Sequence, residues 1–138
     1  MALDVSEISE KVTGRLNAET VIWLTTVGKT GTPAPTPVWF LWSGTEFLVF
    51  SQPGVGKLAN IGRNPAVALN FNSSAQGGAV AVFTGIARVD DTGPTDAEWQ
   101  RYVAKYANDI VGLDYTPEKF RADYSVLVRI EPDKLRGW

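Results

Sequence analysis

Three prolines at alternate positions constrain the fold of this chain more than any other feature. Residues 32–37 read Thr-Pro-Ala-Pro-Thr-Pro, with the rings at Pro33, Pro35 and Pro37. Each ring fixes φ at about −65° and removes one backbone N–H, so the segment is extended and lacks donors along one side. Because a sheet tolerates such a strand only at its edge, the sequence predicts a β-sheet with residues 32–37 at one edge.

Runs of β-branched and aromatic residues, separated by turn residues, predict six strands. We expect them at residues 21–27, 38–42, 46–51, 66–72, 79–89 and 124–131. Apolar spacing and capping residues predict helices at residues 4–18, between Gly54 and Pro65, from Pro94 onward and at 117–123. Most strands are joined as hairpins and the helices do not alternate with them. We therefore predict a mainly β (α+β) fold, an antiparallel barrel of six strands with flanking helices.

Length and charge set further limits. A chain of 138 residues fits one domain, residues 1–138. Its 13 basic and 15 acidic residues give a net charge of −2, which supplies no broad field for nucleic acid or anionic membranes. No apolar run approaches the roughly 20 residues that span a bilayer. We expect a soluble, cytoplasmic protein that neither binds nucleic acid nor inserts into a membrane.

Two residue types are absent, and their absence narrows the chemistry. Without cysteine or histidine, the chain has no thiolate nucleophile, no Ser-His triad and no histidine-ligated metal centre, and we expect no metal site. An enzyme built from it either moves protons with Lys, Asp, Glu, Tyr or Arg, or positions an organic cofactor that carries the reaction.

A glycine-containing turn, Gly-Val-Gly-Lys-Leu-Ala at residues 54–59, leads into the short second helix. It superficially matches the dinucleotide-binding fingerprint, but the helix is too short and no acid stands about 20 residues downstream to bind a ribose. A helix start still exposes unpaired N–H groups at the positive end of its dipole, and Lys57 adds a charge there. Lys57, Asn60 and Asn64 share one helix face, with Arg63 at its margin. This face is either an anion site or an ordinary solvated surface.

Other charged residues give weaker indications. The helix after Pro94 begins among four acids, which are Asp90, Asp91, Asp96 and Glu98. Acids favour the start of a helix, so capping explains them better than catalysis does. Lys11 and Arg15 are four residues apart and repel each other unless an anion lies nearby.

Several segments together resemble a known family. They are Pro-Val-Trp-Phe at 37–40, Phe-Ser at 50–51, Gly-Lys-Leu-Ala-Asn-Ile at 56–61, Arg-Asn-Pro at 63–65 and Val-Ala-Leu-Asn-Phe at 67–71. From Glu19 to Trp138 the chain resembles the pyridoxamine 5′-phosphate oxidase-like flavoproteins, and the Lys-x-x-Asn-Ile-x-Arg-Asn-Pro stretch is the most specific part. The resemblance implies a homodimeric split β-barrel with a cofactor in each interface cleft.

The resemblance also implies roles for particular residues. The cofactor ring is expected along residues 36–40, with its phosphate held by Ser51 and Lys57. Where the family usually has an Arg-Lys pair, this chain has Gly56-Lys57. With this difference and the closing Leu-Arg-Gly-Trp, the chain resembles the branch of the family that uses the deazaflavin coenzyme F420. The expected cofactor-binding residues are Thr36, Pro37, Val38, Trp39, Phe40, Ser51, Gly56, Lys57, Asn60, Arg63 and Trp138. Trp39 or Phe40 is expected to wall the ring and Trp138 to cover the pocket, while Lys11 and Arg15 are weaker candidates for the coenzyme tail.

The function expected from these observations is an F420-dependent reductase that transfers hydride from reduced coenzyme to a small, electron-poor acceptor. No catalytic side chain is expected, because the coenzyme carries the hydride. Two alternatives stay open: an FMN-dependent oxidoreductase of the same fold, and a non-catalytic carrier of F420 or flavin. A homodimer is expected on physical grounds too, since five tryptophans and a proline-edged strand would otherwise expose a ring-lined cleft to water.

Overall fold

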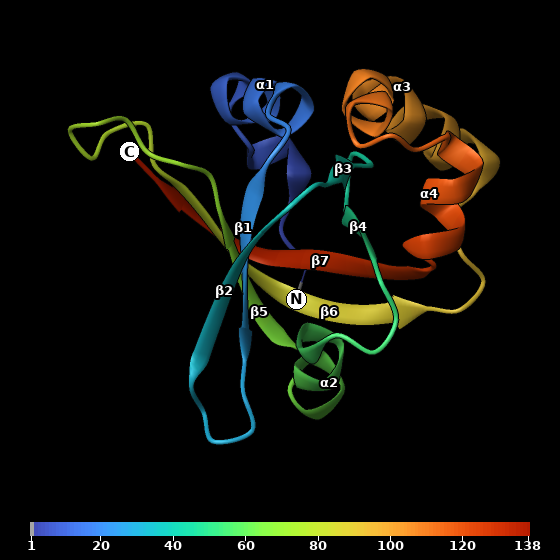
Figure 1. The fold of residues 1–138 in the computed structure, drawn as a ribbon. Helices are drawn as coiled ribbons and strands as arrows, with labels where there is room; N and C mark the ends of the chain where they lie inside the picture. The colour runs from blue at the N-terminus through green and yellow to red at the C-terminus, as the bar shows by residue number, and fades with distance from the viewer. Residues whose placement is uncertain (1) are drawn as a thin grey trace.

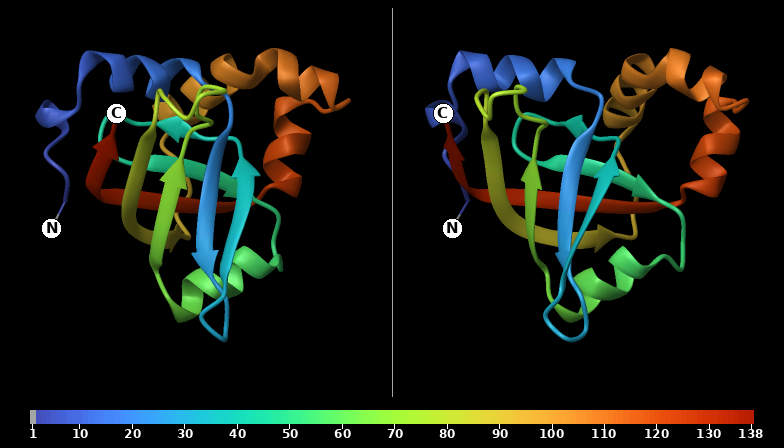
Figure 2. Two further views of the ribbon diagram at one scale, coloured as in Figure 1. Left: turned by 90° about the vertical axis from the view of Figure 1, so that its left-hand side faces the viewer. Right: turned by 60° about the vertical axis from the view of Figure 1, so that its left-hand side comes forward.

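The computed structural model describes residues 2–138, which form one seven-stranded sheet with helices around it (Figure 1). The strands are β1 (Ile22–Val27), β2 (Pro33–Val38), β3 (Leu41–Trp42), β4 (Phe47–Ser51), β5 (Ala66–Asn70), β6 (Ala81–Asp90) and β7 (Val126–Gly137). They lie in the order β2-β1-β5-β6-β7-β4-β3, and every neighbouring pair is antiparallel. The sheet curls into a half-barrel (Figure 2), which confirms the predicted fold class.

The proline-rich strand β2 lies at one edge of the sheet, as predicted. Its three prolines stand opposite Val27, Thr25 and Trp23 of β1. Because proline cannot donate, the N–H groups that bond to β1 come from the intervening residues of β2. The outer side of this edge therefore offers few donors to a further strand.

The helices are η1 (Val5–Glu7, a 3₁₀ turn), α1 (Glu10–Ala18), α2 (Gly56–Arg63), α3 (Asp96–Gly112) and α4 (Pro117–Asp123). The predicted single helix over residues 4–18 is wrong, because two caps divide it. Asp4 accepts from the Ser6 N–H at 3.0 Å and caps only η1, while Ser9 accepts from the Val12 N–H at 3.2 Å and begins α1. Helix α3 begins at Asp96, after its N-cap Thr95, and so two residues later than the predicted start at Pro94.

The sheet has seven strands rather than the predicted six, because the proline-rich segment forms a strand of its own, β2. The expected strand at 38–42 is interrupted, and only Leu41 and Trp42 form β3. Trp39 and Phe40 leave the ladder between β2 and β3. The Phe40 N–H donates to the Tyr106 hydroxyl at 2.8 Å, and that hydroxyl lies 2.7 Å from the carbonyl oxygen of Thr20. A side chain from α3 thus replaces the strand partner at this point.

The last strand is longer than predicted, because residues 132–137 continue β7 instead of forming a tail. They pair with β6 as far as Gly137, which stands opposite Ala81. The register shifts between Thr84 and Gly85, and a Cβ on Gly85 would lie 2.5 Å from the Glu131 carbonyl oxygen. This close backbone approach requires glycine and lets the ladder continue past Pro132.

Two apolar clusters form the core. The first fills the curled sheet and includes Phe40, Phe47 and Phe83, all fully buried. The second lies between β4 and the helices α3 and α4, and contains Tyr102, Tyr106, Ile110, Phe120, Leu48 and Phe50. Helices α3 and α4 lie together, on the opposite side of the molecule from the C-terminus (Figures 1 and 2). Within residues 2–138, none of the helices combines the length and the hydropathy that crossing a bilayer requires.

Candidate functional site

A pocket of about 340 Å³ opens where the end of β2, the start of α2 and the helices α3 and α4 meet. Its lining residues are Pro37, Val38, Trp39, Phe50, Lys57, Tyr102, Leu113, Phe120 and Tyr124. This set, which we call the Lys57 pocket, contains one cation and no carboxylate, and its walls are largely apolar or aromatic. Such a lining suits a flat, mostly apolar ring that carries an anionic group.

Lys57 is the chemically distinctive residue of this pocket. Its side chain is half-buried, and burial lowers the pKa of Lys57 because the ammonium loses hydrating water. Among residues 2–138, no carboxylate forms an ion pair with it. Lys57 is also the second residue of α2, whose N-cap residue Val55 provides no side-chain cap. An anion here would meet both the ammonium and the uncapped helix start.

The predicted ring-wall residues are placed differently from each other. Trp39 lines the pocket, but Tyr106 stacks against its ring at 4.7 Å between centroids and Phe120 at 5.6 Å, both nearly parallel to it. Trp39 is therefore packed against neighbouring rings and is not a free platform for stacking. Phe40 does not line the pocket, because it is fully buried in the barrel core against Phe47. We therefore correct its expected role as a wall of the ring.

Three further predicted residues are neighbours in the chain of residues that line the pocket, but they do not line it themselves. Thr36 and Gly56 are exposed neighbours of Pro37 and Lys57. Ser51 is 1% exposed, and its hydroxyl donates to the Gln52 carbonyl oxygen at 2.9 Å. That proton is already used, so the Ser51 hydroxyl is not free to donate to a phosphate in this arrangement.

Asn60 and Arg63 interact with each other instead of lining the pocket. The Asn60 amide donates to the Thr26 hydroxyl at 3.0 Å, which ties α2 to β1. Its carbonyl oxygen accepts from the Arg63 guanidinium at 2.7 Å. Of the polar face predicted for α2, only Lys57 enters the pocket.

Trp138, Lys11 and Arg15 line a different pocket, of about 290 Å³, between α1 and the end of β7. Arg15 is committed to structural contacts there. It donates to the Glu19 carboxylate, to the Ala79 carbonyl oxygen at 2.5 Å and to the Asn72 carbonyl oxygen at 2.9 Å. Trp138 is 71% exposed. One chain therefore does not bring Trp138 to the Lys57 pocket.

Sequence reasoning missed the residues that α3 and α4 contribute to the pocket. The apolar and aromatic residues at helical spacing after Pro94 are Trp99, Tyr102, Val103, Tyr106 and Ile110. Their spacing predicts a packing face for α3, but it does not show that Tyr102 borders a cavity. Burial raises the pKa of Tyr102, so its phenol stays neutral. Phe120 and Tyr124 stack on each other at 4.4 Å and form the neighbouring wall.

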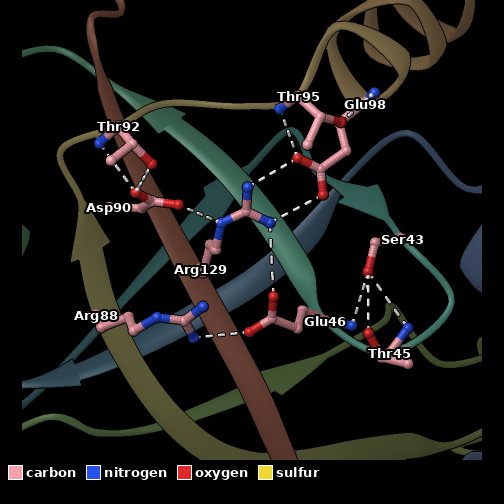
Figure 3. Close-up of polar contacts among 9 residues, drawn as sticks. All are labelled: Ser43, Thr45, Glu46, Arg88, Asp90, Thr92, Thr95, Glu98 and Arg129. Atoms are coloured by element: carbon pink, nitrogen blue, oxygen red, sulfur yellow. Dashed lines mark hydrogen bonds and ion pairs between the residues drawn. The ribbon is translucent and has the colours of Figure 1, made fainter.

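A second group of charges, the Arg129 cluster, occupies the region where β4, β6, β7 and α3 meet (Figure 3). The Arg129 side chain is 9% exposed and lies 2.7 Å from Asp90, 2.7 Å from Glu98 and 3.5 Å from Glu46. Hydrogen bonds from Thr92 and Arg129 lower the pKa of Asp90 to about 2, and those from Arg129 lower the pKa of Glu98.

The capping prediction is confirmed for Glu98, which forms a capping box with Thr95 at the start of α3. Asp90 instead accepts from the N–H and the hydroxyl of Thr92, at 3.0 and 2.6 Å, in the turn before α3. Residue spacing does not indicate that both acids also enclose Arg129 of the last strand.

Comparison with known proteins identifies similarity in sequence and in fold. Residues 8–138 match the protein family described as pyridoxamine 5′-phosphate oxidase. Among curated proteins, none matches the sequence closely enough to count as a relative.

Solved structures of the same fold have different functions. An F420 reductase has a TM-score of 0.68 and 23% identity over 94% of this chain and 98% of that chain. A conserved hypothetical protein from Mycobacterium tuberculosis has a TM-score of 0.70 and 22% identity over 95% and 84% of the two chains. HutZ, the heme storage protein from Vibrio cholerae, has a TM-score of 0.67 and 17% identity over 93% of each chain. At these identities the similarity establishes the fold alone.

Proposed function

This chain belongs to the pyridoxamine 5′-phosphate oxidase family, and from that premise we propose that it is an F420-dependent reductase acting as a homodimer. Bound, reduced F420 supplies the hydride, and a small molecule with an electron-poor double bond accepts it. An F420 reductase among the proteins of the same fold supports this choice of cofactor.

The observation that carries the proposal is the environment of Lys57. A half-buried ammonium without a carboxylate partner is costly, and a bound anion offsets that cost. F420 carries a phosphate that this ammonium and the uncapped start of α2 would hold. Pro37 and Val38 line the same pocket, and in this proposal they support the deazaflavin ring.

The remaining wall residues act by position. Leu113, Phe120 and Tyr124 are apolar or aromatic, so they exclude water and hold an apolar acceptor close to the ring. No carboxylate lines the pocket, and burial raises the pKa of Tyr102, which keeps its phenol neutral. The pocket residues therefore bind, orient and desolvate, and we assign none of them a proton-transfer role.

The outer face of the sheet supports the proposed dimer. Trp23, Asn70 and Val82 are register partners across β1, β5 and β6, and all three are half-buried and uncharged. Trp23 is also the partner of Pro37, so this face extends to the rim of the Lys57 pocket. A second copy packed on it would border the pocket, and any cover by Trp138 must come from that copy. A monomer in sedimentation at micromolar concentration would contradict this part of the proposal.

The cofactor is tested by titrating the purified protein with F420 and FMN side by side. We expect tighter binding of F420 than of FMN. Gly56 stands where the family usually has an arginine, and the loss of this second phosphate donor weakens the binding of FMN. Tighter binding of FMN would replace the proposal with an FMN-dependent oxidoreductase.

A non-catalytic carrier is the second candidate, and the heme storage protein of the same fold favours considering it. Carriers and reductases require the same ring and phosphate contacts, so binding does not separate them. The discriminating assay measures hydride transfer from reduced F420 to a panel of unsaturated acceptors. Tight F420 binding with no turnover on any acceptor would favour the carrier.

A further inference from the structure

A groove between α1 and α3 contains two cations that the proposed function does not use. One part, of about 270 Å³, is lined by Leu16, Asn17, Leu41, Trp42, Arg101, Ala104 and Lys105. A second part, of about 250 Å³, shares Asn17, Trp42 and Arg101 with it and continues along α1. Of the residues that line the two parts, only Arg101 and Lys105 are charged.

Both cations are fixed by backbone carbonyl groups at the β3 side of the groove. The Arg101 guanidinium donates to the Trp42 carbonyl oxygen at 2.9 Å, and the Lys105 ammonium donates to the Phe40 carbonyl oxygen at 2.9 Å. The Lys105 nitrogen also lies 3.8 Å from the centre of the Phe40 ring. Each side chain keeps further N–H donors after these bonds are counted.

Glu19 at the end of α1 acts electrostatically on Lys105, but no carboxylate lines the groove. Within residues 2–138, neither Arg101 nor Lys105 forms an ion pair with a carboxylate. They are four residues apart on α3, a spacing at which like charges destabilise a helix. An anion placed between them would remove this repulsion and accept their remaining hydrogen bonds.

We propose that this groove binds a small carboxylate with an apolar body. The guanidinium of Arg101, the ammonium of Lys105 and the amide of Asn17 supply donors for the carboxylate. The rest of the lining, which is Leu16, Leu41, Trp42 and Ala104, is apolar and suits a short aliphatic or aromatic group. This site is distinct from the Lys57 pocket, with which it shares no lining residue.

Binding at this site is expected to depend on pH. Two charged groups act on Lys105: Arg101 on the same helix and Glu19 at the end of α1. Burial and repulsion from Arg101 lower the pKa of Lys105 to about 8, and Glu19 partly opposes this shift. A bound carboxylate favours the ammonium form. Binding therefore takes up protons near pH 8, and affinity falls as the pH rises from 7 to 9.

Calorimetric titration of the full chain with benzoate tests the proposal, with benzamide as the uncharged analogue. We expect benzoate to bind and benzamide to bind at least tenfold more weakly. Arg101→Gln and Lys105→Gln should each weaken benzoate binding about tenfold, since each removes one charge-assisted hydrogen bond. Lys134→Gln, at an exposed lysine of β7, is the matched control and should bind benzoate as the wild type does.

Lys105→Arg separates a binding role from a merely structural one. It keeps the positive charge, so we expect it to bind benzoate at pH 7 and to lose the decline in affinity between pH 7 and 9. Arg101→Gln should keep a decline but shift it to higher pH, because the repulsion that helps to lower the pKa of Lys105 is removed. Equal binding of benzamide and benzoate, or wild-type affinity in both glutamine variants, would overturn the proposal. Thermal melting checks that the variants fold, and an F420 titration of Lys105→Gln shows whether the Lys57 pocket is intact.

Discussion

Lys57 and Arg129 are both shielded from water to some extent, but only Arg129 is surrounded by carboxylates. Lys57 is half-buried among apolar and aromatic side chains, with no carboxylate in its pocket. Arg129 is 9% exposed on its side chain and is enclosed by Asp90, Glu98 and Glu46 (Figure 3). A charge taken out of water requires compensation, which the fold supplies for Arg129 and does not supply for Lys57.

This difference separates structural cations from binding cations better than residue type does. Arg15, for which the sequence suggested a role in binding the coenzyme tail, resembles Arg129, because Glu19 and two carbonyl oxygens occupy its donors. Lys57 has no such partners, so a ligand must supply the compensation. The predictions below test this comparison, beginning with the largest expected effect.

Removing the internally compensated cation should cost the most stability. In Arg129→Ala, three carboxylates remain close together without their common partner, so we expect the free energy of unfolding to fall by about 3–5 kcal/mol. Urea denaturation measures this change. Arg88→Ala is the control, because its ion pair with Glu46 is 54% exposed at the arginine and contributes about 1 kcal/mol or less. Equal losses in the two variants would contradict the comparison.

Removing the uncompensated cation should affect binding instead of stability. Lys57→Ala should weaken F420 binding about tenfold to a hundredfold, since a hydrogen bond to a charged group contributes about 1.5–3 kcal/mol. Its free energy of unfolding should not fall, because the substitution removes a half-buried ammonium whose desolvation destabilises the wild type. Arg63→Ala, which removes an exposed cation bonded to Asn60, should bind F420 nearly as the wild type does. Wild-type affinity in Lys57→Ala would remove Lys57 from the site.

Both regions should make the protein more stable as the pH rises, but in different pH ranges and for different reasons. The pKa values of Asp90 and Glu98 are lowered in the fold, so their contribution is complete above about pH 5. It is lost as the pH falls toward 2, through the lowered pKa values. The pKa of Lys57 is also lowered in the fold, which means that its ammonium form is destabilised there. Stability therefore rises on the alkaline side, as the pH increases toward the pKa of lysine in the unfolded chain.

Urea denaturation across the pH range measures both responses. Asp90→Asn should flatten the acid side of the stability profile, and Lys57→Met should flatten the alkaline side. An acid limb of unchanged slope in Asp90→Asn would show that the hydrogen bonds from Thr92 and Arg129 do not lower the pKa of this carboxyl in the fold.

Much of the fold follows from local rules that the sequence carries. The prolines place β2 at an edge, and the Thr116-Pro117 pair begins α4 at the predicted residue. The errors arise where distant groups act. The Tyr106 hydroxyl interrupts the strand at Phe40 from across the core, and the β6–β7 ladder extends past Pro132 because Gly85 lies opposite it.

The site was less predictable than the fold, for a similar reason. Lys57 could be predicted, because its charge and its position at a helix start are local properties. The stacking of Tyr106 and Phe120 on Trp39 and the separation of Trp138 from Lys57 depend on how α3, α4 and β7 pack. Neither has a signal in residue spacing.

The smallest effect is expected where acids lie outside the Lys57 pocket. Asp91 and Asp96 are exposed near the start of α3, and no carboxylate lines the pocket. If the pocket residues only position the reactants and exclude water, Asp91→Asn and Asp96→Asn should each keep turnover within about tenfold of the wild type. A general acid or base usually contributes about 10²–10⁴. The assay uses reduced F420 with an acceptor on which the wild type turns over. A thousandfold loss with unchanged folding and F420 affinity would assign a proton-transfer role to that acid, and the contrast between the two cations would no longer account for the chemistry.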